Sequence, residues 1–200
     1  MSENNVQIIG AGVVGAGDFE KITINGTGNI KGEITAKSLN VNGVAKACEN
    51  ITAEKVEING TFSGRNIKGK KIVIRGIADF NGKVECEQFE LNGSIRCDSI
   101  NSEQIEIKLK GFGNVNELVG SHINVKVNEP TLIIMSVQIK PSVLKAKMIE
   151  ADEIYLEHTE ADVVSGNIVQ IGRGCKIGRV EYRESLKVSD SAGVEQIVKE

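Results

Sequence analysis

The chain has 200 residues, and its 24 basic residues almost balance its 27 acidic residues, with no long run of either sign. Nucleic acid is therefore not an expected partner, and the absence of tryptophan and the low aromatic content of 4% also argue against base-stacking platforms. The first residues show no basic region followed by an apolar core, and no stretch approaches about 18 consecutive apolar residues. We expect one elongated domain in the cytoplasm.

The N-terminal segment contains a dinucleotide-binding pattern, with Gly10, Gly12 and Gly15 following a short apolar run. The function of that loop is to place a pyrophosphate at a helix N-terminus, so a helix must follow it at once. Residues 18–26 instead predict a strand and a turn. We therefore expect no nucleotide and no cofactor, and interpret the glycine-rich segment as a flexible lead into the first repeat.

A short apolar-x-apolar strand followed by a turn then recurs along the chain. The turn glycines are Gly26, Gly43, Gly60, Gly76 and Gly93, at spacings of 17, 17, 16 and 17 residues. Self-similarity at a nearly constant period indicates a repeat architecture in which each unit buries its apolar face against its neighbours.

Aligning the repeats gives four columns. The strand pair recurs as Leu39/Val41, Val56/Ile58, Ile72/Ile74, Phe89/Leu91, Ile105/Ile107 and Ile123/Val125. An aliphatic residue stands five places earlier, at Ile34, Ile51, Ile67, Val84, Ile100 and Leu118. A small residue follows it two places later, at Ala36, Ala53, Gly69, Cys86, Ser102 and Gly120. A column on a third side consists of Ile30, Ala47, Phe80, Cys97 and Val115, and Gly64 leaves it empty once.

These columns predict an all-β protein, a single parallel β-solenoid with about 16 to 18 residues per coil. Such a coil is too short for a strand and a helix, because the helix alone needs about 10 residues. Asn-Gly provides the positive φ of a tight corner. A meander of hairpins would bring the strands closer together in sequence and would not keep three apolar sides in register.

The columns divide the chain into four parts. Regular repeats are predicted over residues 1–127, an irregular interruption over 128–147, further coils over 148–188, and a polar tail or cap over 189–200. The interruption contains both prolines and the most apolar run of the chain. A short helix opened by Pro141, over 142–150, is an alternative for part of it.

Candidate chemical groups are few. The four cysteines, Cys48, Cys86, Cys97 and Cys175, lack the spacing of a zinc or redox site, and inward cysteines act as small hydrophobic residues. The carboxylates Glu57, Glu90, Glu106 and Glu153 are spread over coil surfaces near lysines, where no cleft is expected to raise a pKa. We expect neither a metal site nor catalytic residues.

Residues 171–178 read as two units of the hexapeptide repeat of left-handed β-helix acyltransferases. That family resembles this chain only locally, because the spacings within a coil are about four, five and two residues rather than six. The family implies a histidine base at a trimer interface, and His122 and His158 both stand beside strand positions. An acyltransferase-like enzyme is therefore a lesser alternative.

The recurrent pattern, as in Leu39-Asn40-Val41-Asn42-Gly43 and Gly32-Glu33-Ile34-Thr35-Ala36, resembles the bactofilin family of bacterial polymer-forming cytoskeletal proteins. The block from Ile149 to Glu157 is similar to segments of longer Gram-positive members. The resemblance covers most of residues 17–182. It implies a right-handed solenoid that assembles end to end into non-polar filaments without nucleotide, as a scaffold for cell shape, envelope enzymes or motility.

Unpaired strand edges at the two ends of a solenoid are templates for another chain. We therefore predict homopolymerisation through the end coils, whose candidate residues are Ile8, Ile22, Ile24, Val180, Tyr182, Leu186 and Val188. The alternative is a non-polymerising adaptor that binds a partner through its flank, at the candidate surface Leu132, Ile133, Ile134 and Met135. Membrane- or envelope-associated proteins are further candidate partners, and the inner face of the membrane is a further expected location.

Overall fold

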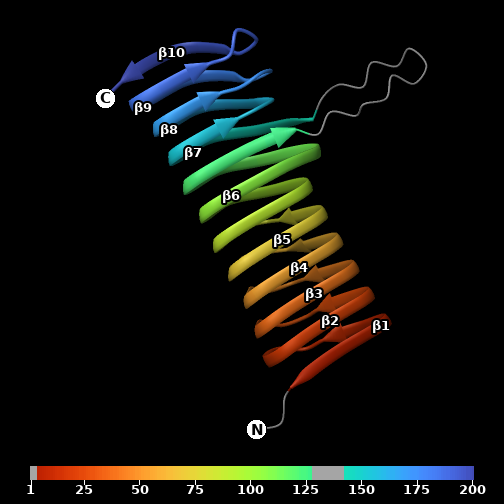
Figure 1. Cartoon of the computed structure of the whole chain (residues 1–200). Coiled ribbons are helices and arrows are strands. Elements are labelled where there is room, and N and C mark those ends of the chain that lie inside the picture. The colour runs from red at the N-terminus through yellow and green to blue at the C-terminus, as the bar shows by residue number, and fades with distance from the viewer. Residues whose placement is uncertain (1–3, 128–141) are drawn as a thin grey trace, which may run out of the picture.

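One ladder of ten strands winds around a single axis in the computed structural model, which describes residues 4–127 and 142–200 (Figure 1). The spatial order of the strands follows the chain, and each neighbouring pair is parallel. The fold is a parallel β-solenoid of about 11 turns with about 17 residues per turn, which confirms the predicted fold class. At about 4.8 Å per turn, the stack is a rod roughly 50 Å long, with the two termini at opposite ends.

The strands are β1 (Asn5–Val14), β2 (Gly17–Ile30), β3 (Ile34–Ala47), β4 (Ile51–Gly64), β5 (Ile67–Phe80), β6 (Lys83–Val127), β7 (Val143–Leu156), β8 (Thr159–Ile171), β9 (Lys176–Val188) and β10 (Gly193–Lys199). Because β6 spans 45 residues, it passes through more than one turn of the solenoid.

The core consists of aligned columns of apolar side chains. Leu39, Val56, Ile72 and Phe89 are register partners in successive turns, and all four are fully buried. Because the ladder is parallel, one sequence position repeats on the same side of every turn, so the columns predicted from the sequence coincide with the pairing register.

The structure adds an inward column that the sequence alignment missed, two places before the third-side column. It contains Gly28, Ala45, Phe62, Ala78 and Ile95. Phe62 is fully buried, and its ring lies 5.6 Å from that of Phe80. A Cβ added at Gly64 would lie 2.9 Å from the Phe62 ring. The place that appeared empty at Gly64 is therefore occupied by the aromatic ring of Phe62 on the same strand.

Glycines form a second ladder at one corner of the solenoid. Gly26, Gly43, Gly60, Gly76 and Gly93 have φ between +128° and +155°. A Cβ at any of them would lie 1.8 to 2.2 Å from the carbonyl oxygen of the glycine one turn earlier. Both the backbone conformation and the close stacking therefore require glycine here.

The asparagines beside these glycines extend the corner ladder. The Asn42 side-chain amide donates to Oδ1 of Asn25 at 2.9 Å, and the Asn59 amide donates to Oδ1 of Asn42 at 3.0 Å. Each amide can donate to one turn and accept from the next, so this side-chain ladder follows the backbone ladder along the axis.

The glycine-rich N-terminal segment differs from its prediction as a flexible lead. Residues 5–14 form strand β1, which pairs with β2 in continuous register, Gly10 opposite Gly26. The segment that follows is strand β2 rather than the helix that a dinucleotide loop needs. Gly10 continues the glycine corner, because its φ is +86° and its carbonyl oxygen approaches Gly26 as those of later glycines do in their turns.

Two further boundaries need correction. The solenoid resumes at Val143 rather than at residue 148, and Leu144 is fully buried, so residues 143–150 form strand rather than the alternative helix. Part of the predicted polar tail forms strand β10, which pairs with β9 from Gly193 to Lys199. Buried and exposed side chains alternate only weakly along β10, because one side of this last strand has no turn stacked on it.

Candidate assembly surfaces

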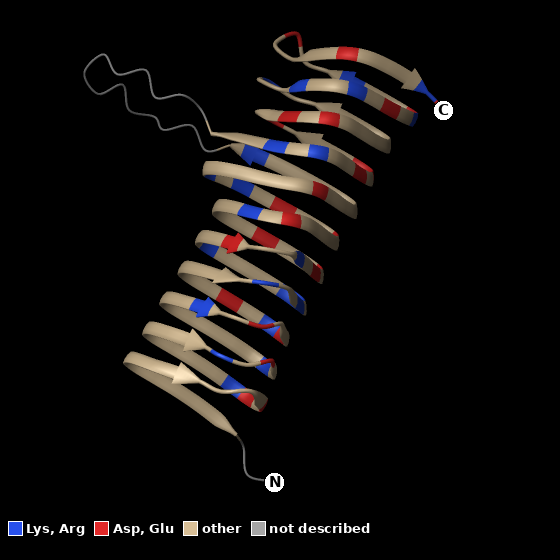
Figure 2. Cartoon of the chain, turned by 180° about the vertical axis from the view of Figure 1, so that it is seen from behind, with Lys and Arg blue, Asp and Glu red and all other residues tan. Residues whose placement is uncertain are grey.

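The N-terminal end of the rod is an open strand edge. In the described residues, β1 is the first strand of the ladder and pairs only with β2. Ile8 and Val14 point inward, with 7% and 2% of their surface exposed. Residues 4–17 contain no charged side chain, and Figure 2 shows β1 without the blue and red bands carried by later turns.

Alternation along β1 decides which backbone groups face this edge. The carbonyl oxygen of Asn4 accepts from Glu20 N at 3.0 Å, and that of Val14 accepts from Lys31 N at 2.9 Å. Successive residues of a strand direct their N–H and C=O groups to opposite sides. The even-numbered residues therefore bond to β2, and Gln7, between Val6 and Ile8, directs its backbone groups to the open edge.

The C-terminal end is a step rather than a full turn. The pairing of β10 with β9 runs from Lys176 to Tyr182, which leaves the second half of β9 without a strand above it in the described residues. The step ends where Glu200 N donates to the Tyr182 carbonyl at 3.0 Å. On β10, Ile197 is 53% exposed. This end carries charges, including the Arg183–Glu200 ion pair at 3.3 Å.

The structure relocates part of the predicted self-association set, which consists of Ile8, Ile22, Ile24, Val180, Tyr182, Leu186 and Val188. Ile22 and Ile24 are fully buried beneath β1 and are not at the end of the stack. Val180 and Tyr182 lie beneath β10, opposite Ile197 and Lys199. Only Ile8, Leu186 and Val188 lie on terminal strand segments.

Because the sequence placed the ends of the solenoid too far inward, it did not predict three exposed apolar residues on the terminal strands. Ile9, Val13 and Ile197 are exposed on the terminal strands by 78%, 57% and 53%. The sequence does contain a signal for strand β1, because Val6, Ile8 and Val14 match the column template one turn before Ile22, Ile24 and Ile30. The predicted partner surface Leu132, Ile133, Ile134 and Met135 lies outside the described residues.

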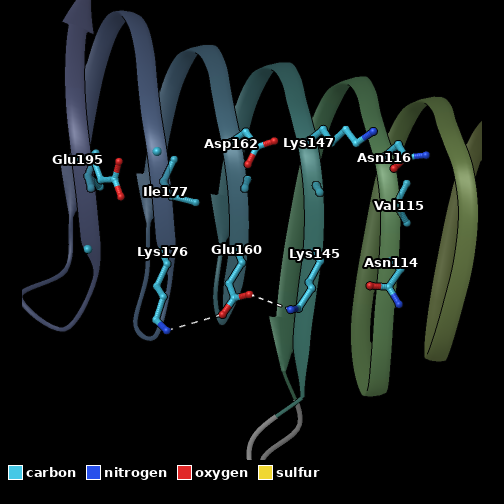
Figure 3. A pocket seen from close by; sticks show the side chains of 15 residues that line it. Asn114, Val115, Asn116, Lys145, Lys147, Glu160, Asp162, Lys176, Ile177 and Glu195 are labelled. Carbon is cyan, nitrogen blue, oxygen red and sulfur yellow. Dashed lines mark ion pairs between the residues drawn. The ribbon is translucent and has the colours of Figure 1, made fainter.

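A groove of about 860 Å³ runs along one flank of the later turns, from β6 to β10. On one of its sides, Glu160 lies between Lys145 at 3.3 Å and Lys176 at 3.7 Å, in line along successive turns (Figure 3). The lining contains no histidine, cysteine or hydroxyl side chain. The groove therefore offers no hydroxyl, thiol or imidazole nucleophile, and its Glu160 carboxylate forms ion pairs with two lysines.

The other titratable groups considered in the sequence lie on the surface or pack in the core. The Lys55 ammonium, 2.8 Å away, lowers the pKa of Glu57. Burial raises the pKa of the Cys97 thiol to about 12, so this inward cysteine is protonated at neutral pH. His122 lies 3.7 Å from Glu153 on an exposed flank, and His158 lies in the turn between β7 and β8.

Two absences hold for residues 4–127 and 142–200. No group of three or more histidine, cysteine or acidic side chains there is arranged to hold a metal ion. No helix in this part of the chain has the length and apolar character needed to cross a bilayer.

The chain is similar over half its length to two curated proteins of Bacillus subtilis (strain 168). It is 37% identical over 101 residues to "Uncharacterized protein YhbE", a match covering 50% of this chain and 42% of that protein. It is 35% identical over 101 residues to "Uncharacterized protein YhbF", covering 50% and 41%. The match thus spans about two fifths of each relative. No protein-family model matches the chain, and no solved structure matches it.

Proposed function

We propose that this chain is a non-enzymatic scaffold that assembles end to end into filaments without nucleotide, as its resemblance to bactofilins implies. The observation that carries the proposal is the uncovered ladder edge of β1, which has apolar inward residues and no charge. Natural proteins protect a free edge with charge, proline or a covering segment. In the described residues, β1 has none of these.

The terminal strands also repeat the geometry of the interior. Val6 and Ile8 stand above Ile22 and Ile24 in the same inward columns. A further strand laid on this edge would therefore meet backbone donors and acceptors at the ladder spacing and apolar side chains in an existing column. Addition of a strand to a sheet edge draws its affinity from main-chain hydrogen bonds. The cytoplasm, including the inner face of the membrane, is the proposed location, with envelope-associated proteins as clients of the scaffold.

Gln7→Pro is the sharpest test of the N-terminal edge. Gln7 is exposed and directs its N–H away from β2, so proline removes a donor from the open edge and leaves the β1–β2 ladder intact. Negative-stain electron microscopy and sedimentation of nucleotide-free protein should show filaments for the wild type and at least about a tenfold loss of polymer mass for Gln7→Pro.

Gln7→Ala is the matched control, because it removes the same side chain and keeps the backbone N–H. It should polymerise like the wild type. Discrete small particles from wild-type protein would contradict the scaffold proposal and favour a flank-binding adaptor. Filaments from folded Gln7→Pro protein, with unchanged circular dichroism, would show that the β1 edge takes no part in the end joint.

A further inference from the structure

One flank of the N-terminal half presents an exposed row of apolar and β-branched side chains. We call Ala11, Thr27, Val44, Thr61 and Ile77 the apolar stripe; they are register partners in five successive turns. Val44 and Ile77 are 50% and 43% exposed. Thr61 lies between them, so the two exposed aliphatic side chains share one row without touching, and this row makes the flank a candidate interaction surface.

The register partner of Ile77 in the next turn is the buried Ser94, and a larger apolar side chain lies beyond it. Phe112 is 40% exposed, and the Arg96 guanidinium lies 5.6 Å from the centre of its ring. Arg96 pairs in register with Asp79, two places beyond Ile77. The small Ala11 and the large Phe112 therefore lie toward opposite ends of the same flank.

A second outward row runs two places after the stripe on each strand. It contains Asn29, Lys46, Ser63, Asp79 and Arg96. Lys46 lies one turn before Ser63, and Asp79 lies one turn after it. The Asp79 carboxylate accepts from Arg96 at 2.9 Å, and its side chain is still 37% exposed. The two positions next to Ser63, Lys46 and Asp79, are thus of opposite charge, and Arg96 lies one turn beyond Asp79.

This arrangement is self-complementary about one two-fold axis. Let the axis lie in the plane of contact, along β4, through Thr61 and Ser63. The rotation places each row against the same row of the second copy and reverses the order of turns. Val44 then faces Ile77 of the second copy, and Lys46 faces its Asp79. The same operation brings Ala11 toward Phe112, a small residue toward a large one. An isologous contact requires this reciprocity.

The competing orientation does not fit. A two-fold axis parallel to the rod would keep turns at the same height. Midway between the rows, such an axis would place Val44 against Lys46 and Ile77 against Asp79, so apolar side chains would meet charged ones. Along the stripe itself, it would place Phe112 against Phe112 and Ala11 against Ala11, so large would meet large and small would meet small. Charge and shape together therefore favour rods lying side by side and antiparallel. Two copies of this chain also share the same repeat of about 4.8 Å per turn, so all the pairs stay in step along the contact.

We propose that the apolar stripe and its charged row form a lateral, antiparallel interface between two copies of this chain. The partner is a second copy because the surface complements itself in sign and size. This interface lies on the flank, so it is independent of the end joint proposed above. End joints determine the length of an assembly, and this flank determines whether rods occur singly or in pairs.

Charge reversal with mixing tests the pairing directly. Lys46→Glu alone places a second carboxylate against Asp79 of the other copy, and Asp79→Lys alone places a second ammonium group against Lys46 of the other copy. Each variant therefore repels itself twice per pair. In a mixture of the two variants, each repulsive contact becomes an attractive one. Each variant alone should pair about tenfold or more weakly than wild type, and the mixture should recover pairing to within about threefold.

Analytical ultracentrifugation measures the pairing, and electron microscopy records the width of the rods separately from their length. Lys31→Glu, a charge reversal at an exposed lysine outside both rows, is the matched control and should pair like the wild type. Circular dichroism checks that each variant is folded. Wild-type rods of single width, equal pairing by the separate variants, or no recovery on mixing would overturn the proposal. A loss of length with pairing retained would contradict the end joint alone.

Discussion

The glycine corner ladder makes a quantitative prediction at Gly60. A Cβ at this position would lie 2.1 Å from the carbonyl oxygen of Gly43, about 1 Å inside the closest contacts that real Cβ atoms make, and φ is +139°. The conformation alone costs roughly 1 to 3 kcal/mol for a residue with a side chain. Separating the two turns weakens one or two ladder hydrogen bonds at about 1 kcal/mol each. Gly60→Ala should therefore lower the free energy of unfolding by about 3 to 5 kcal/mol.

Urea unfolding followed by circular dichroism is the assay. Gly15→Ala is the matched control, because nothing lies within 4 Å of a Cβ there and φ is outside the positive region. The control should change stability by less than about 1 kcal/mol, because the added side chain also restricts the unfolded chain. If Gly60→Ala proved as stable as Gly15→Ala, close stacking of the corners would not be what requires glycine.

Two further predictions concern the core. Phe62→Ala should lower the free energy of unfolding by about 3 to 5 kcal/mol. Adding Gly64→Phe should recover more than half of that loss, because it gives this turn the Ala-x-Phe order of residues 78–80. If urea unfolding showed that the effects of the two substitutions simply add, this prediction would be wrong. Burial raises the pKa of the Cys97 thiol from about 9 to about 12, so the unfolded chain ionises first as pH rises. Cys97→Ala should reduce the loss of stability between pH 9 and pH 11 in the same assay, and an unchanged pH profile would show that this thiol does not contribute.

The period of the sequence was sufficient to predict the fold because a solenoid copies one environment in every turn. Each column position is tested several times along the chain, and a single exception such as Gly64 does not obscure the period. That exception also marks the limit of the method. The column containing Phe62 alternates between glycine, alanine and large residues, because it shares its space with the neighbouring column. Only the three-dimensional packing shows that Phe62 and Gly64 together fill one volume.

The ends were harder to predict than the interior. A terminal turn has a neighbour on one side only, so its sequence is less constrained by columns, and β1 looked like a glycine-rich loop. Moving the end outward by one turn buried Ile24, which had been predicted as an end residue. The lateral rows were missed for a different reason. Outward positions show no apolar period, and the match of Lys46 to Asp79 appears only when the register and a symmetry operation are both known.

The register between β6 and β7 bears on how assembly proceeds. Register partners across it run without a shift from Phe112 opposite Val143 to Val125 opposite Leu156. The partners are 31 residues apart there, against 16 or 17 between earlier strands, so the extra residues add length to one turn without displacing the columns. The chain is therefore one continuous stack rather than two arrays joined by a spacer. A continuous stack has one pair of ends, so end joints alone extend it in one dimension, and any increase in width has to come from a flank.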